Sequence, residues 1–85
     1  METRVALIGI IVEQESSAAA LNALLHEYSA YIIGRMGIPY RARSINIVSI
    51  AIDAPQDVIS ALSGKIGSLD GISVKTAYSN VLADE

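Results

Sequence analysis

Two segments of the chain are apolar at nearly every position. They are RVALIGIIVE (4–13) and INIVSIAI (45–52), and both are rich in Val and Ile. Successive side chains of a β-strand point to opposite faces of the sheet, so strands of this composition are apolar on both faces. We therefore predict that these segments form the central strands of one sheet.

Two further segments predict the outer strands. Residues 31–38 contain two glycines, which weaken a strand interior and are tolerated at a sheet edge. In this strand we expect the odd-numbered side chains, including Arg35, on one face and the even-numbered ones on the other, and we expect Pro39 to end it. Residues 72–79 alternate more cleanly and predict the last strand.

The segments between the strands have a helical period. In 18–28 the apolar residues recur at i, i+3, i+4 and i+7, which predicts an inward stripe of Leu21, Leu24, Leu25 and Tyr28. Ser16 or Ser17 is the expected N-cap, and Asn22 and His26 lie on a different face. A second helix follows DAPQD, with Asp53 or Ala54 as its cap, Pro55 in its first turn and an inward face of Val58, Leu62, Ile66 and Leu69.

The order of these elements predicts a single α+β domain over residues 1–85, with a ferredoxin-like βαββαβ topology and an ordered core at about 4–79. In this topology two helices cover one face of a four-stranded antiparallel sheet, and the first and third strands are central. Because both central strands are apolar front and back, we expect the face without helices to pack against a second subunit in a homodimer or homotetramer. The tail from Asn80 should be loose.

The composition narrows the chemistry. The chain has 85 residues, of which 52 % are hydrophobic, a net charge of −3, one histidine and no cysteine. We therefore expect no thiolate metal site, no metal and no cofactor. The six Lys and Arg residues are too scattered for direct nucleic-acid binding, and the apolar run from Val5 to Val12 is too short to cross a bilayer. These features favour a cytoplasmic protein.

The stretch GRMGIPYR (34–41) contains the candidate binding residues of the second strand. Arg35 could present its guanidinium to an anionic ligand, with Gly37 allowing a close approach, or it could be an edge-strand charge that discourages aggregation. Tyr40 is expected at an interface or a pocket rim. Arg41 is either a further binding residue or a solvated loop charge.

Two other groups are candidates near the first helix. His26 and Glu27 could couple ligand binding to pH, or His26 could cap carbonyl groups or contact a neighbouring subunit. The segment with Glu15, Ser16 and Ser17 precedes the helix, whose N-terminus could receive a carboxylate, although the acidic side chains of this segment would repel one. No Ser, His and Asp positions match a catalytic triad, so we expect no enzymatic activity.

The blocks LHEY, GRMGIPYR and ALSGKIG…GISVKTAYS, together with RVALIGIIVE, resemble the small stand-alone ACT-like proteins known as iron-only hydrogenase system regulators. The resemblance covers residues 4–79. It implies a regulatory domain that forms dimers or tetramers and is similar to the sensing domain of nickel-responsive repressors. The chain lacks the histidine and cysteine ligands of those repressors, so nickel sensing is not implied.

The resemblance also implies effector binding beside Glu15, Ser16 and Ser17, because ACT-like domains commonly bind small molecules at the first strand-to-helix junction, against a neighbouring subunit. The leading hypothesis is therefore a non-enzymatic, homo-oligomeric sensor of a small molecule. The alternative is an adaptor that docks a larger protein through a patch around Arg35, Tyr40 and Arg41, without a small ligand.

Overall fold

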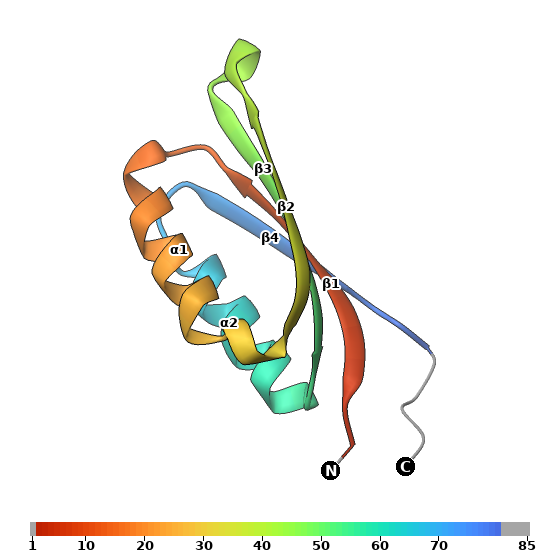
Figure 1. The fold of residues 1–85 in the computed structure, drawn as a ribbon. Coiled ribbons are helices and arrows are strands. Elements are labelled where there is room, and N and C mark those ends of the chain that lie inside the picture. The colour runs from red at the N-terminus through yellow and green to blue at the C-terminus, as the bar shows by residue number, and fades with distance from the viewer. Residues whose placement is uncertain (1, 81–85) are drawn as a thin grey trace.

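The computed structural model describes residues 2–80, which form a four-stranded sheet with two helices (Figure 1). The strands are β1 (Arg4–Val12), β2 (Ile32–Tyr40), β3 (Ile45–Ala54) and β4 (Ile72–Tyr78), and the helices are α1 (Ala18–Glu27) and α2 (Gln56–Gly67). Short 3-10 turns occupy Glu15–Ser17, Ser29–Tyr31 and Arg41–Arg43. The tail predicted to be loose lies, after Asn80, outside the described residues. No helix within residues 2–80 is long and apolar enough to span a bilayer.

All strand pairs are antiparallel, and the strand order is β2-β3-β1-β4. This is the predicted ferredoxin-like topology, and the two strands that are apolar on both faces are the central ones, as expected. Both helices lie on one side of the sheet (Figure 1). The β2–β3 hairpin extends beyond the helices and contributes to the elongated shape of 44 × 20 × 17 Å.

The core lies between the helices and one face of the sheet. Every second residue of β1 and β3 is buried there, and each helix contributes a narrow stripe. The buried apolar residues are Ala6, Ile8, Ile10, Val12, Leu21, Leu25, Val48, Ile50, Ile52, Ala54, Ile59, Leu62 and Ile66. The inward face predicted for α2 was partly wrong. Leu62 and Ile66 are buried as expected, but Ile59 is buried as well, and Val58 and Leu69 are only partly buried at the margin of the core. Leu24 and Tyr28 of α1 are likewise only partly buried.

No helix of residues 2–80 covers the opposite face of the sheet, and we call it the open sheet face. Paired residues of neighbouring strands share a face, which places on it Val5, Leu7, Gly9 and Ile11 of β1, Ile45, Ile47, Ser49, Ala51 and Asp53 of β3, Gly34, Met36, Ile38 and Tyr40 of β2, and Ser73, Lys75 and Ala77 of β4. Most of these side chains are apolar. Leu7 is 51 % exposed and Met36 is 52 % exposed, values typical of surface residues although both side chains are large and hydrophobic.

Strand β2 differs from the prediction at both ends. Pro39 does not end it but pairs with Asn46, which is possible because β2 is an edge strand and a missing N–H is tolerated there. At the other end the register shifts between Ile32 and Gly34. Ile32 pairs with the buried Ile52, so it lies on the helix side together with Arg35, and the strict alternation expected for this strand was wrong.

The start of α2 also differs from the prediction. Asp53 and Ala54 remain in β3, and Pro55 is the N-cap residue, with φ −58° and ψ 150°. The Pro55 carbonyl accepts hydrogen bonds from the N–H groups of Val58 and Ile59. The preset φ of proline thus fixes the corner before the helix and not its first turn.

Two hydrogen bonds connect the corner between β1 and α1 to the turn that precedes β4. The Glu13 N–H donates to the Gly71 carbonyl at 2.7 Å, and the buried Ser17 hydroxyl donates to the Asp70 carbonyl at 2.6 Å. Gly71 has φ +68°, a left-handed conformation that glycine adopts at little cost, and a Cβ at this position would overlap Gln14. These contacts hold the first and last strands of the sequence in register.

We expect Gly71→Ala to lower the free energy of unfolding by about 2 kcal/mol, because it adds a left-handed alanine and a steric overlap with Gln14. Gly64→Ala is the matched control. It lies in α2, where an added Cβ meets no atom within 4 Å, and should raise the free energy of unfolding by about 0.5 to 1 kcal/mol through helix propensity. Urea unfolding followed by circular dichroism measures both. Equal effects of the two substitutions would contradict this account of the corner.

Candidate ligand-binding groove

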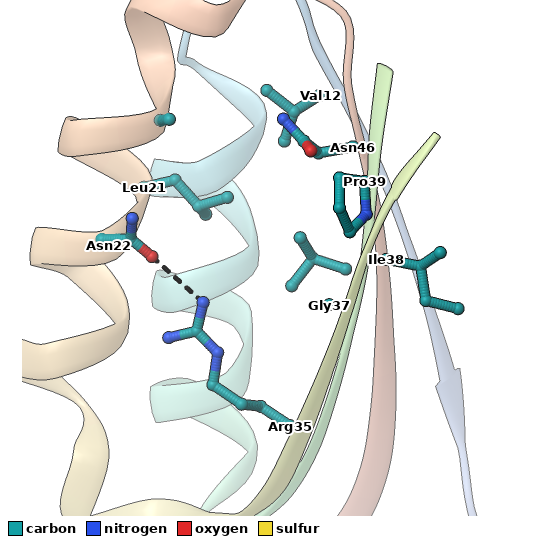
Figure 2. A pocket seen from close by; sticks show the side chains of 10 residues that line it. Val12, Leu21, Asn22, Arg35, Gly37, Ile38, Pro39 and Asn46 are labelled. Atoms are coloured by element: carbon teal, nitrogen blue, oxygen red, sulfur yellow. Dashed lines mark hydrogen bonds between the residues drawn. The ribbon is translucent and has the colours of Figure 1, made fainter. Parts of the chain in front are cut away.

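A groove runs between α1 and β2 on the helix side of the sheet, and we call it the α1/β2 groove. Arg35, Gly37 and Pro39 border it, because they pair with residues of β3 that face the helices. Met36, Ile38 and Tyr40 alternate with them and lie on the open sheet face. Figure 2 shows Ile38 directed away from the groove. From Arg35 to Tyr40, strand β2 therefore presents its odd-numbered residues to the groove and its even-numbered ones to the opposite surface.

One part of the groove is a hollow of about 330 Å³, which we call the Arg35 hollow. Its floor is formed by buried aliphatic side chains of three elements, Val12 of β1, Leu21 of α1 and Val48 of β3. Asn22, Arg35 and Asn46 provide the polar groups at its margin. An apolar floor with a few polar groups is the usual composition of a small-molecule site.

Arg35 crosses the groove from β2 to α1 (Figure 2). Its Nη2 donates a hydrogen bond of 3.0 Å to Oδ1 of Asn22, and both side chains are exposed to solvent. Within the described residues this is the one side-chain hydrogen bond between α1 and β2, and Arg35 makes no ion pair there. A guanidinium has five N–H donors, so most of its donors stay available for a ligand.

A second hollow, of about 380 Å³, lies on the other side of the Arg35–Asn22 bond. His26 borders it together with Leu25, Ser29 and Ile32. Asn22 and His26 are one helical turn apart, and the sequence prediction that they share a face outside the buried stripe is confirmed by their places on this groove. Arg35 borders both hollows.

A third depression joins two candidates that are far apart in the sequence. Glu15 and Arg41 both line it, with Ser44 and Asn46, and it shares Val12, Pro39 and Asn46 with the Arg35 hollow. The depression is more polar than the first hollow and lies beside the turn of the β2–β3 hairpin. The junction before α1 and the turn of the hairpin thus border one continuous surface.

Four candidates have other surroundings. The Ser17 hydroxyl is buried and engaged with the Asp70 carbonyl, and the Ser16 hydroxyl accepts a hydrogen bond from Gln14 Nε2. Neither serine forms a side-chain cap of α1. Tyr40 lies on the open sheet face. Glu27 faces Lys65 of α2 at 3.8 Å, outside the groove.

Lys65 joins the end of α1 to α2. Its Nζ donates a 2.9 Å hydrogen bond to the Tyr28 hydroxyl and lies 5.2 Å from the centre of that ring. The hydrogen bond with Tyr28, and then the charges of Tyr28 and Glu27, raise the pKa of Lys65 above its usual value. This cluster holds the two helices together and does not border the groove.

Sequence reasoning did not include Asn22 or Asn46 among the binding residues. Asn46 interrupts the apolar run INIVSIAI, and Asn22 is four residues before His26. In the sequence, both asparagines stand out as polar residues within largely apolar segments, and this was the available signal. Their proximity to Arg35 depends on tertiary structure. Residues 2–80 contain no group of three His, Asp or Glu side chains that could hold a metal ion.

Because Ser17 is buried and its hydroxyl hydrogen-bonded, we expect Ser17→Ala to lower the free energy of unfolding by about 1 to 2 kcal/mol by leaving the Asp70 carbonyl without its donor. Ser16→Ala, at an exposed position one residue away, should change it by less than about 0.5 kcal/mol. Denaturant unfolding measures the difference. A Ser16 variant as unstable as the Ser17 variant would contradict the structural role assigned to Ser17.

Comparison with known proteins places the chain in a family. A model described as "TM1266-like: Iron-only hydrogenase system regulator, putative" matches residues 4–76. The structure of uncharacterized protein TM1266 from Thermotoga maritima is similar with a TM-score of 0.87 and 36 % identity, and the match covers 91 % of this chain and 98 % of that one.

A formyltetrahydrofolate deformylase from Pseudomonas putida KT2440 shares the fold alone, with a TM-score of 0.65 and 11 % identity over 91 % of this chain and 29 % of its own. No curated protein sequence matches the chain. The family model and the identity with TM1266 extend over most of the sequence, and the chain therefore belongs to the TM1266-like family.

Proposed function

We propose that this protein is a non-enzymatic, cytoplasmic regulator that assembles as a homodimer or homotetramer through the open sheet face and senses a small molecule in the α1/β2 groove. The description of its family supports a role in an iron-only hydrogenase system. The observation that carries the proposal is the apolar character of a sheet face that no helix of the described chain covers.

The open sheet face has the composition of an interface. Leu7 is 51 % exposed, Met36 52 %, Ile38 46 % and Tyr40 47 %, and they lie in neighbouring rows of one surface. Contiguous apolar patches of this kind are rare on monomers and mark interaction sites. A depression of about 370 Å³ centred on Gly9, between Ile11, Ile47 and Lys75, offers a place for a side chain of the partner.

Strand β2 is the physical link between assembly and ligand. It is an edge strand held by β3 on one side, and all its side chains except Ile32 are exposed. A ligand between α1 and β2 would fix Arg35 and Gly37, and the strand period would transmit this change to Met36 and Ile38 on the open sheet face. Ligand binding would thereby alter the affinity between subunits.

The description of the family as a regulator supports a role other than catalysis. The adaptor alternative required Arg35, Tyr40 and Arg41 in one patch. Arg35 and Tyr40 lie on opposite sides of β2, which favours the sensor over the adaptor.

We expect the wild-type protein to sediment as a dimer or tetramer at micromolar concentration, and Leu7→Lys to sediment as a monomer, because a charge would be buried without a partner in the centre of the interface. Sedimentation velocity measures both. Ala20→Lys adds the same charge to an exposed position of α1, outside the groove, and should leave the assembly intact. A monomeric wild type, or an intact Leu7→Lys oligomer, would contradict the proposal.

We also expect any small molecule that raises the melting temperature by binding the groove to change the subunit dissociation constant by about 5-fold to 150-fold. Thermal shift measurements with carboxylates, amino acids, nucleotides and metal ions identify such molecules, and sedimentation with and without them measures the coupling. Stabilising ligands that leave the dissociation constant unchanged would refute the sensing mechanism.

A further inference from the structure

We propose that the Arg35 hollow binds a small aliphatic monocarboxylate, with the carboxylate on the guanidinium of Arg35 and the hydrocarbon on the floor formed by Val12, Leu21 and Val48. This inference rests on the proposed sensing function and names the chemical class of its ligand. It follows from the charge, the lining and the size of the hollow.

The charge of the hollow is positive and uncompensated. Arg35 is the one charged side chain that lines it, and it is hydrogen-bonded to a neutral amide at 3.0 Å. In the described part of the chain its guanidinium has no carboxylate partner. Arginine pairs with carboxylates through two parallel N–H···O bonds, and Asn22 occupies only Nη2. The Asn22 bond orients the side chain across the groove, so little rotamer freedom remains to be lost on binding.

Apart from the neutral amides of Asn22 and Asn46, the remaining lining is aliphatic. Val12 is 3 % exposed, Leu21 3 % and Val48 7 %, so the floor is a fixed part of the core and does not have to be assembled by the ligand. Ala18, Gly37 and Pro39 complete the walls without polar side chains. A volume of about 330 Å³ is at the lower end of ligand sites, which favours a short or branched hydrocarbon chain.

The lining disfavours an amino acid as the ligand. No acidic side chain borders the Arg35 hollow, and Glu15 lines only the neighbouring depression. An ammonium group would therefore meet the neutral amides of Asn22 and Asn46, and it would lose hydration without gaining a charged partner. A nucleotide or phosphate is also disfavoured, because its several negative charges would have only the single guanidinium of Arg35 as a partner.

The test uses three probes of nearly the same shape: 3-methylbutanoate, its neutral amide 3-methylbutanamide, and valine, which is 3-methylbutanoate with an added α-ammonium group. Each is titrated at pH 7 into the full-length, isotope-labelled protein, and binding is followed through the backbone amide signals of Asn22, Arg35 and Gly37. We expect 3-methylbutanoate to shift these signals saturably and to bind at least about tenfold more tightly than the amide or valine.

Arg35→Gln should weaken 3-methylbutanoate at least about tenfold, and Arg35→Lys should weaken it less, because lysine keeps the charge but loses the bidentate geometry. Arg43→Gln is the matched control. It removes the same charge from the exposed hairpin turn, outside the three hollows, and should leave the affinity unchanged. Well-dispersed amide spectra of each variant show that it is folded.

Equal binding of the acid and its amide, tighter binding of valine, an unaffected Arg35→Gln variant, or no saturable shift with the acid would each overturn the carboxylate assignment. Failure of the proposed function is a separate result. In that case 3-methylbutanoate binds through Arg35 but leaves the sedimentation of the oligomer unchanged. Conversely, if a ligand of another class binds the groove and alters assembly, the proposed sensing function stands and only the assignment of a carboxylate ligand is overturned.

Discussion

The structure depends on an imbalance between apolar sheet surface and helix. Strands β1 and β3 carry aliphatic side chains on both faces, and the two helices cover one of these faces. Hydrophobic burial is the main favourable term in folding and association, and its size follows the apolar area removed from water. The core on the helix side stabilises the single chain. Burial of the apolar side chains on the opposite side is the driving force that we assign to assembly.

This arrangement gives β2 an unusual position. A central strand would be held on both edges, but β2 is paired only with β3 and bridged to α1 by the Arg35–Asn22 bond. It borders the groove with one set of side chains and the open sheet face with the other. A strand that is paired on one side only and shared by two surfaces is a suitable element for coupling them, because a change at one set of its side chains also moves the other set.

The sequence predicted the architecture well because its main signals are periodic. The doubly apolar runs identified the central strands, and the helical spacing of Leu21 and Leu25 identified the helix face. The errors lie where one residue decides the local geometry: Pro39 stays in an edge strand, Pro55 caps α2, and the irregularity at Ile33 reverses the side on which Ile32 lies. Periodicity alone carries no information about such local exceptions.

The site was predictable only in part. Arg35 and Gly37 were identified from a local break in the strand pattern, but their neighbours Asn22 and Asn46 come from segments 13 and 11 residues away from Arg35 and are brought together by packing. Ser17 was expected to bind a ligand because the resemblance to ACT-like proteins implies effector binding at the first strand-to-helix junction, whereas its hydroxyl is engaged with the Asp70 carbonyl. Long-range hydrogen bonds of this kind leave no signature in the sequence.

The most direct measurement of the central claim is the solvent accessibility of individual methyl groups in solution. A soluble paramagnetic reagent broadens the signals of methyl groups that water reaches. We expect the methyl signals of Leu7, Ile11 and Ile47 to be protected from it, while those of Ala20 and Ala23 on the outer surface of α1 are broadened. If the methyl groups of the open sheet face broaden as strongly as those of the two alanines, no second copy covers that face and the account is wrong.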